Sequence, residues 1–154
     1  AKGNARRCVT LWVAAMVWGS GTLNGRGPWR TAQGLAHVEL GPILVASHQH
    51  LRAGELAEAY DVAATIPGSA EASFTKWLWA AALGLPDLQP SPLVLDHRLR
   101  RTLAALDVRP QHNAAGYVDY LHAADLAATK LRRSHGCKGA TAEKVELLLS
   151  QVST

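Results

Sequence analysis

The chain is organised around residues 66–99, which read IPGSAEASFTKWLWAAALGLPDLQPSPLVLDHRL. This stretch predicts a turn at 67–69, followed by a helix that carries residues 73–79. A loop with three prolines then leads to the apolar run 93–95, which we expect to be buried. The stretch therefore predicts a turn, a helix, a loop and a buried segment in that order.

Lys76 and Asp96 are the candidate functional residues of this stretch. Lys76 lies in an otherwise apolar helix, and a charged lysine is unremarkable on a surface but costly to bury in a cleft. Asp96 ends the apolar run and precedes a helical stretch at 97–103, where a carboxylate caps free backbone N–H groups. Two alternatives remain: Lys76 can be a surface lysine whose stem shields Trp79, and Asp96 can be a cap alone.

The rest of the chain reads as further helices separated by short breaks. No period-two alternation of useful length is present, so we expect an all-α fold and a single compact domain over residues 1–154. Asn113 and Thr141 are candidate N-caps. The first helix is apolar around most of its circumference and should lie in the core. The expected helices span residues 5–18, 29–38, 43–51, 55–66, 113–133 and 141 onward.

A glycine–arginine block separates the first two of these helices. Glycines at positions 19, 21, 25 and 27 disfavour a regular helix and let the backbone approach another group closely. Pro28 fits the first turn of the next helix, which leaves Arg26 and Arg30 near free N–H donors that would suit a phosphate. The alternative is a tight turn between helices, with both arginines in solvent.

The charge of the chain favours an anionic partner. The formal net charge is +4 and the pI is about 9.4. Basic residues cluster at 6–7, 98–101 and 130–133, and clusters of this kind are typical of nucleic-acid-binding surfaces. They are also typical of solvated helix faces. Charge alone therefore leaves both interpretations open.

Cysteine and histidine usage predicts neither a metal nor a cofactor. Cys8 and Cys137 are too few for a disulfide scaffold or a four-cysteine iron–sulfur cluster, so we expect reduced thiols in a cytoplasm. His48 and His50 lie two positions apart, which directs them to different sides of a helix. The longest apolar run, residues 9–18, has about half the ~20 residues that a membrane span needs. We therefore expect no membrane segment.

The order of elements in residues 66–99 resembles the core of the helix-hairpin-helix DNA glycosylases. The closest resemblance is to the 8-oxoguanine DNA glycosylase-like proteins, whose aspartate follows the lysine after about one helix and one loop. Asp96 follows Lys76 by 20 positions (96 − 76), which fits this spacing. Residues 18–31 also resemble the glycine- and arginine-rich stretch of the bacterial group. The Gly-x-Gly turn of the family is represented by Gly68 and Ser69 and lacks its second glycine.

This resemblance implies a fold and an activity. The fold would have two helical lobes with a cleft between them. The activity would be that of a DNA glycosylase with AP-lyase activity, which flips an oxidised purine such as 8-oxoguanine out of the duplex. Lys76 would form a Schiff base that leads to β-elimination, and Asp96 would stabilise positive charge on the sugar or orient the amine. The partner would be double-stranded DNA with a damaged or modified base, and the enzyme would be a monomer in the bacterial cytosol or nucleoid.

The resemblance also assigns candidate binding residues. Arg30 matches the position at which an arginine of the family contacts the opposite strand. The candidate DNA contacts are Arg26, Arg30, Gly68, Ser69, Arg98 and Arg101. The candidate stacking residues of the base pocket are Trp18, Phe74 and Trp77.

Two alternative functions remain at this point. One is a glycosylase that acts on modified bases of foreign DNA, such as phage DNA. The other is a helical DNA-binding domain without catalytic activity, which the missing hairpin glycine and the short chain favour.

Overall fold

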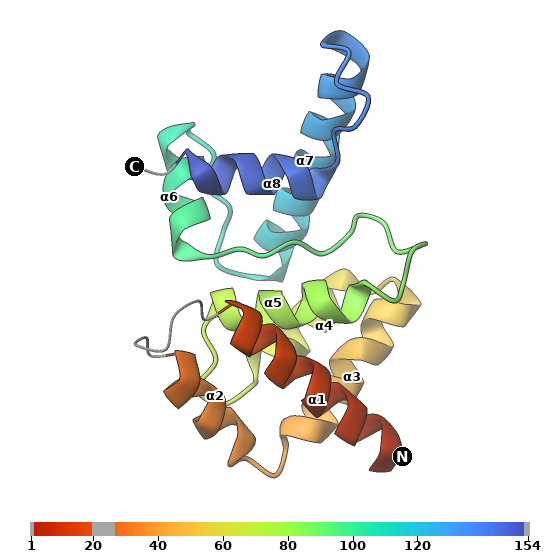
Figure 1. Cartoon of the computed structure of the whole chain (residues 1–154), viewed down its shortest axis with the longest axis vertical. Coiled ribbons are helices and arrows are strands. Elements are labelled where there is room, and N and C mark those ends of the chain that lie inside the picture. Colours follow the sequence, from red (N-terminus) through yellow and green to blue (C-terminus); the bar gives the residue numbers. More distant parts are fainter. Residues whose placement is uncertain (1, 20–26, 153–154) are drawn as a thin grey trace.

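The fold was determined as a computed structural model that describes residues 2–19 and 27–152. These residues form helices and no strand, so the predicted all-α fold is confirmed for this part of the chain (Figure 1). The helices are α1 (Lys2–Gly19), α2 (Gly27–Leu35), α3 (Leu40–Ala53), α4 (Leu56–Ala64), α5 (Glu71–Ala82), α6 (His97–Ala105), α7 (Ala114–Ser134) and α8 (Ala142–Gln151).

Side-chain caps begin the last three helices where the sequence predicts them. Asp96 accepts a hydrogen bond from the Leu99 backbone N–H at 2.8 Å and begins α6. Asn113 begins α7 and Thr141 begins α8 in the same way. Each cap satisfies one of the N–H groups that a helix start leaves without an intrahelical partner. These caps therefore fix where α6, α7 and α8 start.

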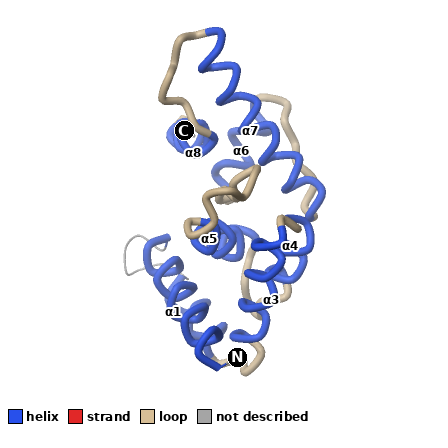
Figure 2. The backbone as a smooth tube through the Cα atoms, turned by 90° about the vertical axis from the view of Figure 1, so that its right-hand side faces the viewer, coloured by secondary structure: helices blue, strands red, loops and turns tan. Residues whose placement is uncertain are grey.

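The helices lie in two groups. Figure 1 shows α1 to α5 in the lower part of the molecule and α6 to α8 in the upper part, with residues 83–96 passing between them. Figure 2 shows α7 extending from beside α4 to the far end of the upper group, and α7 packs on both α4 and α8. Tyr117 of α7 lies 5.0 Å from the Tyr60 ring of α4 and donates its hydroxyl to the Leu93 carbonyl at 2.8 Å. The two groups thus share one core.

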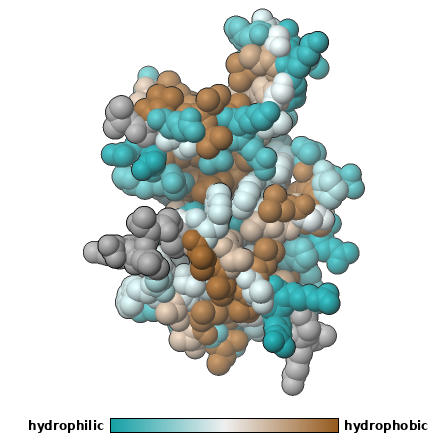
Figure 3. All heavy atoms as spheres, in the orientation of Figure 1, coloured by the Kyte–Doolittle hydropathy of each residue, from teal (hydrophilic) through white to brown (hydrophobic). Residues whose placement is uncertain are grey.

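The first helix differs from its prediction as a fully buried element. One face of α1 is in the core through Trp12, Ala15 and Met16, while Val17 and Trp18 are exposed. The physical reason is that α1 packs against α2, α3 and α5, which cover only part of its circumference. In Figure 3, apolar side chains remain visible on the surface over both groups of helices.

Candidate active site

Lys76 lines a pocket. The pocket has a volume of about 300 Å³, at the lower end of ligand pockets, and we call it the lysine pocket. Helices α1, α2 and α5 and the turn before α5 contribute its walls. Its lining residues are Trp12, Met16, Gly19, Gly27, Arg30, Thr31, Pro67, Gly68, Ser69, Ala72, Ser73 and Lys76. The structure therefore brings the glycine–arginine block against the hairpin turn and the lysine, which lie far from it in the sequence.

The Lys76 side chain is half-buried and its ammonium group has a defined partner. Lys76 Nζ donates a hydrogen bond to the Gly19 carbonyl oxygen at 3.0 Å. Burial lowers the pKa of Lys76 below its ordinary value, and the Asp96 carboxylate offsets part of this effect. A lysine of this kind loses its proton more readily than a solvated one, which a nucleophilic amine requires.

Asp96 acts on Lys76 from outside the lysine pocket. Asp96 is half-buried at the start of α6, and its carboxylate serves as the cap of that helix. It is not among the residues that line the lysine pocket, and it makes no ion pair with Lys76 within the described structure. The two groups interact over a longer distance than a hydrogen bond. The predicted cleft between two lobes stays a prediction, because the pocket that Lys76 lines belongs to the α1–α5 group.

A buried hydrogen bond sets the position of Asp96 relative to Lys76. The backbone N–H of Leu95 donates to Thr75 Oγ1 at 3.1 Å, and Thr75 is fully buried. Thr75 precedes Lys76 and Leu95 precedes Asp96, so this bond joins the chain immediately before each candidate catalytic residue. The two residues therefore keep a fixed separation even though 20 positions (96 − 76) lie between them in the sequence.

A charged pair that the sequence did not reveal ties the same two helices together. Arg100 of α6 donates to both carboxylate oxygens of Glu71 on α5, at 2.6 and 2.7 Å, and also to the Pro110 carbonyl. Burial alone would raise the pKa of Glu71, but hydrogen bonds from Arg100 and Tyr60 outweigh it, so the pKa is lowered. Arg100 belongs to the basic cluster at 98–101, for which a solvated helix face was one of the two interpretations. It points inward because Glu71 lies against it.

The predicted DNA contacts divide between the lysine pocket and the surface. Arg30, Gly68 and Ser69 line the pocket, and Gly68 has a φ of 70°, which favours glycine at this turn. The Ser69 hydroxyl is buried and lacks a hydrogen-bond partner in the described structure. Arg98 and Arg101 are exposed on α6. Arg26 lies outside the described residues.

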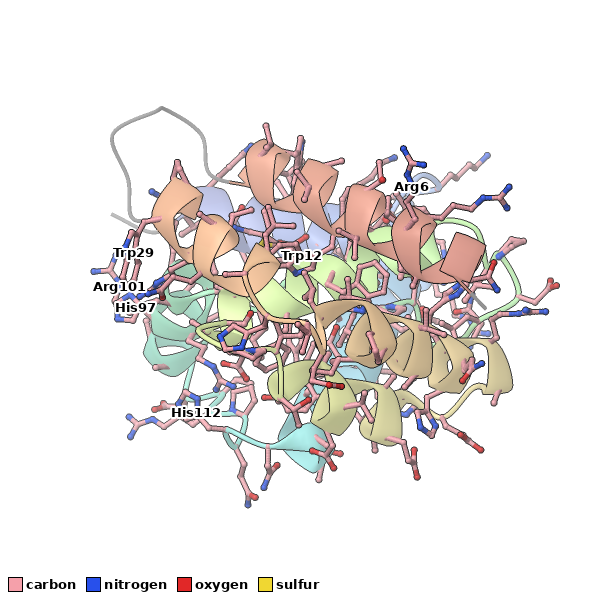
Figure 4. All side chains as sticks on the ribbon, turned by 90° about the horizontal axis from the view of Figure 1, so that it is seen from below. Arg6, Trp12, Trp29, His97, Arg101 and His112 are labelled. Carbon is pink, nitrogen blue, oxygen red and sulfur yellow. The ribbon has the colours of Figure 1, made fainter. Side chains whose placement is uncertain are left out.

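One side of the molecule carries exposed cationic and aromatic side chains. Trp29, in the first turn of α2, is 61% exposed. Figure 4 shows Trp29, His97 and Arg101 at the same edge of the molecule, and Figure 1 places α2 and α6 on the same side. Arg6 lies at the opposite edge in Figure 4. The positive charge of α6 is therefore on the same side as the start of α2.

Phe74 and Trp77, which are predicted to stack on the base, are buried in the core and are not among the residues that line the lysine pocket. Trp77 is 1% exposed and donates its indole N–H to Ser47 Oγ at 3.2 Å, and Phe74 packs edge-on against Tyr60 at 4.9 Å. Both rings fill the core because α5 is apolar on nearly every side. Trp18 is exposed but stacks on Trp79 at 4.9 Å. The aromatic residue that lines the lysine pocket is Trp12.

The described residues were also compared with what a metal site and a membrane-spanning helix require. No three His, Cys, Asp or Glu side chains converge there as the ligands of a metal ion would. None of the described helices combines the length and the apolar character that crossing a membrane requires.

Comparison with protein families assigns the chain to a family. Residues 1–150 match the family described as "Putative 8-oxoguanine DNA glycosylase OGG-like protein". Comparisons with curated proteins and with solved structures gave no match. The family makes DNA the class of substrate. Because the match spans nearly the whole sequence, the chain belongs to the OGG-like family of DNA glycosylases.

Proposed function

We propose that this protein is a DNA glycosylase with AP-lyase activity that excises an oxidised purine, such as 8-oxoguanine, from duplex DNA. In this proposal it acts as a monomer in the bacterial cytosol. The observation that carries the proposal is the half-buried Lys76, which lines a pocket and whose pKa is lowered by burial while the Asp96 carboxylate acts on it. A lysine on an open surface would lack the pocket and the desolvation.

The chemistry follows from the two charged groups. The neutral amine of Lys76 attacks the anomeric carbon of the sugar, and the bond to the base breaks as positive charge develops on the sugar. The Asp96 carboxylate stabilises that charge. The resulting Schiff base with the opened sugar allows β-elimination, which nicks the strand. The hydrogen bond between Leu95 and Thr75 supports this mechanism because it fixes Asp96 relative to Lys76.

Duplex DNA would contact the side of the molecule that carries Trp29, Arg98 and Arg101. The turn at Gly68 and the first N–H groups of α5 would hold a phosphate, because Ala70 at the start of α5 provides no side-chain cap. Arg30 in the lysine pocket would contact the opposite strand near the extruded base. These contacts are those of an enzyme that holds the backbone while one base leaves the stack.

Borohydride trapping tests the nucleophile directly. The wild-type protein is incubated with duplexes that each carry one lesion, including 8-oxoguanine, and base release and covalent trapping are scored. Lys76→Gln should lose trapping and still bind the duplex. Lys130→Gln serves as the matched control because Lys130 is exposed on α7, away from the lysine pocket. Trapping by Lys76→Gln at the wild-type level would show that another group is the nucleophile.

The hairpin turn favours one second candidate, a DNA-binding domain without catalytic activity. The turn offers Gly68 and Ser69 but no second glycine, so it presents fewer backbone N–H groups to a phosphate. This candidate predicts salt-dependent binding to DNA with no release of any base. The lesion panel separates it from the enzyme.

A further inference from the structure

Two tryptophans from different helices form a stacked pair. Trp18 on α1 and Trp79 on α5 have ring centroids 4.9 Å apart, and their planes are inclined by only 20°. Stacking of this kind is one of the favourable arrangements of two aromatic rings. We call Trp18 and Trp79 the tryptophan pair. It joins two helices that both contribute to the walls of the lysine pocket.

The tryptophan pair adjoins the proposed nucleophile on both helices. On α1, Trp18 directly precedes Gly19, whose carbonyl oxygen accepts the hydrogen bond from Lys76 Nζ at 3.0 Å. On α5, Trp79 follows Lys76 by three positions, so the two side chains are neighbours on the helix surface. Gly19 and Lys76 line the lysine pocket, whereas neither tryptophan does. The pair therefore lies next to the pocket and outside it.

Trp18 keeps one face open to solvent. It is 64% exposed although Trp79 covers one face of its ring. Because a flat ring has two faces, this exposure includes the face that is turned away from Trp79. Trp12 and Trp77, by contrast, are 2% and 1% exposed and fill the core. Trp18 thus offers an aromatic surface that the described part of the chain leaves uncovered.

Trp79 holds Trp18 in this orientation. Its indole N–H donates to Glu143 Oε1 of α8 at 3.3 Å, and its side chain packs against the hydrophobic core. The ring that supports Trp18 is therefore fixed from two directions. A contact surface that is ordered before binding loses less conformational freedom when a ligand binds. The open face of Trp18 is preorganised in this sense.

The tryptophan pair is on the side of the molecule where we place the duplex. Figure 1 shows α1 running from the N-terminus toward the side on which α2 begins. Gly19 at the end of α1 and Gly27 at the start of α2 line the same pocket. Trp18 follows Arg6 by 12 positions (18 − 6), which corresponds to about 18 Å along a helix. Trp18 is therefore close to the start of α2 and remote from the Arg6 edge.

We propose that the open face of Trp18 stacks on a nucleobase that becomes exposed when the damaged base is extruded. This inference rests on the proposed function. When a nucleotide leaves the duplex, the base opposite it loses its partner and the bases beside it lose a stacking neighbour. An aromatic side chain can stack on any of them, because every base has a π-face. The extruded base itself would occupy the lysine pocket, which Trp18 does not line.

Binding to a duplex with a stable abasic-site analogue tests this inference, because such a duplex contains the gap and has no damaged base to release. Trp18→Ala should bind this duplex about tenfold more weakly than the wild type and should bind the fully paired duplex with unchanged affinity. Trp18→Phe keeps an aromatic face and should recover most of the lost affinity. Leu126→Ala removes another exposed apolar side chain, on α7, and is the matched control. Fluorescence anisotropy gives each affinity.

A 2-aminopurine reporter in the abasic duplex identifies the base on which Trp18 stacks. The fluorescence of this base analogue decreases when an aromatic ring stacks on it. One duplex carries the reporter opposite the gap, and a second duplex carries it beside the gap. The wild type should quench the reporter more strongly than Trp18→Ala does in one of these duplexes. That duplex distinguishes the opposite base from a neighbouring base, and equal quenching by both proteins in both duplexes overturns the inference.

Three binding results would also overturn the inference. The first is equal affinity of Trp18→Ala and the wild type for the abasic duplex. The second is an equal loss of affinity for the abasic and the fully paired duplex, which would place Trp18 on the DNA backbone. The third is a Trp18→Phe variant that binds as weakly as Trp18→Ala, because an aromatic face would then not be what binds.

A second copy of this chain is the other possible occupant of the open face. If sedimentation shows a dimer that Trp18→Ala dissociates, while binding to the abasic duplex is unchanged, Trp18 is a contact between copies and the inference is wrong. None of these results decides the proposed function, which depends on base release and on trapping by Lys76. If no duplex of the lesion panel loses a base, the proposed function fails, and the abasic duplex still shows whether Trp18 stacks on DNA.

Discussion

At the scale of single residues, Gly19 determines where the Lys76 amine lies. A Cβ atom at position 19 would lie 2.5 Å from Cδ and 2.6 Å from Nζ of Lys76. No real side chain tolerates such contacts, so the lysine reaches the Gly19 carbonyl only because the residue is glycine. The glycine that the sequence indicated as a place of close approach is thus in contact with the proposed nucleophile.

Gly19→Ala should displace Lys76 without unfolding the protein, because the atoms that must move belong to the end of a flexible side chain. We expect the rate of borohydride trapping to fall at least about tenfold, since misplacement of a reacting group by about 1 Å is enough for a large loss of rate. The melting temperature should change little. Gly84→Ala is the matched control, because a Cβ atom at Gly84 meets nothing within 4 Å. If both variants trap DNA at the same rate, Gly19 does not determine the position in which the Lys76 amine reacts.

At the scale of elements, the position of α5 relative to α6 depends on Arg100 and Glu71. Their side chains are 13% and 17% exposed, and the pair is bidentate. Removing one member of a buried pair leaves an uncompensated charge. Because Glu71 is on the helix of Lys76 and Arg100 on the helix of Asp96, the pair supports the geometry of both candidate catalytic residues.

Arg100→Met should therefore lower the free energy of unfolding by about 3 kcal/mol at pH 7. The pKa of Glu71 is lowered in the folded protein, so its charge stabilises the fold above the ordinary value of 4.5, and this contribution is lost as pH falls through the lowered value. The difference in the free energy of unfolding between wild type and Arg100→Met should consequently be smaller at pH 3 than at pH 7. Urea unfolding at the two pH values measures it, with Arg101→Met at an exposed position as control. If Arg100→Met lowers the free energy of unfolding by the same amount at pH 3 and pH 7, the charge of Glu71 does not contribute to the stability of the fold.

The starts of α6, α7 and α8 could be predicted because a cap and the helix it begins are adjacent in the sequence. The contact of Arg100 with Glu71 could not, because 29 positions separate the two residues and local patterning placed Arg100 on a solvated face. The burial of Phe74 and Trp77 could not be predicted for a related reason. An apolar pattern on all sides of α5 does not indicate which aromatic ring faces the pocket.

At the scale of the whole molecule, the net charge of +4 does not show where the basic residues lie, and they lie at different edges of the molecule. Arg101, His97 and Trp29 lie at one edge, and Arg6 lies at the opposite edge (Figure 4). The lysine pocket includes Arg30 from the helix that begins with Trp29. A duplex bound along the first edge would therefore run past the pocket, whereas one bound at the Arg6 edge would not.

Arg101→Gln tests this orientation, because a phosphate contact contributes to binding through the counterions that it releases. We expect this variant to bind duplex DNA more weakly and to reduce the slope of log affinity against log salt by about 1, independently of the sequence of the duplex. Arg6→Gln has the same change of charge at the opposite edge and should keep the wild-type slope. Fluorescence anisotropy with one labelled duplex at several salt concentrations gives both slopes. If Arg6→Gln reduces the slope and Arg101→Gln does not, DNA binds the opposite edge, and Lys76 could not reach an extruded base from the orientation proposed.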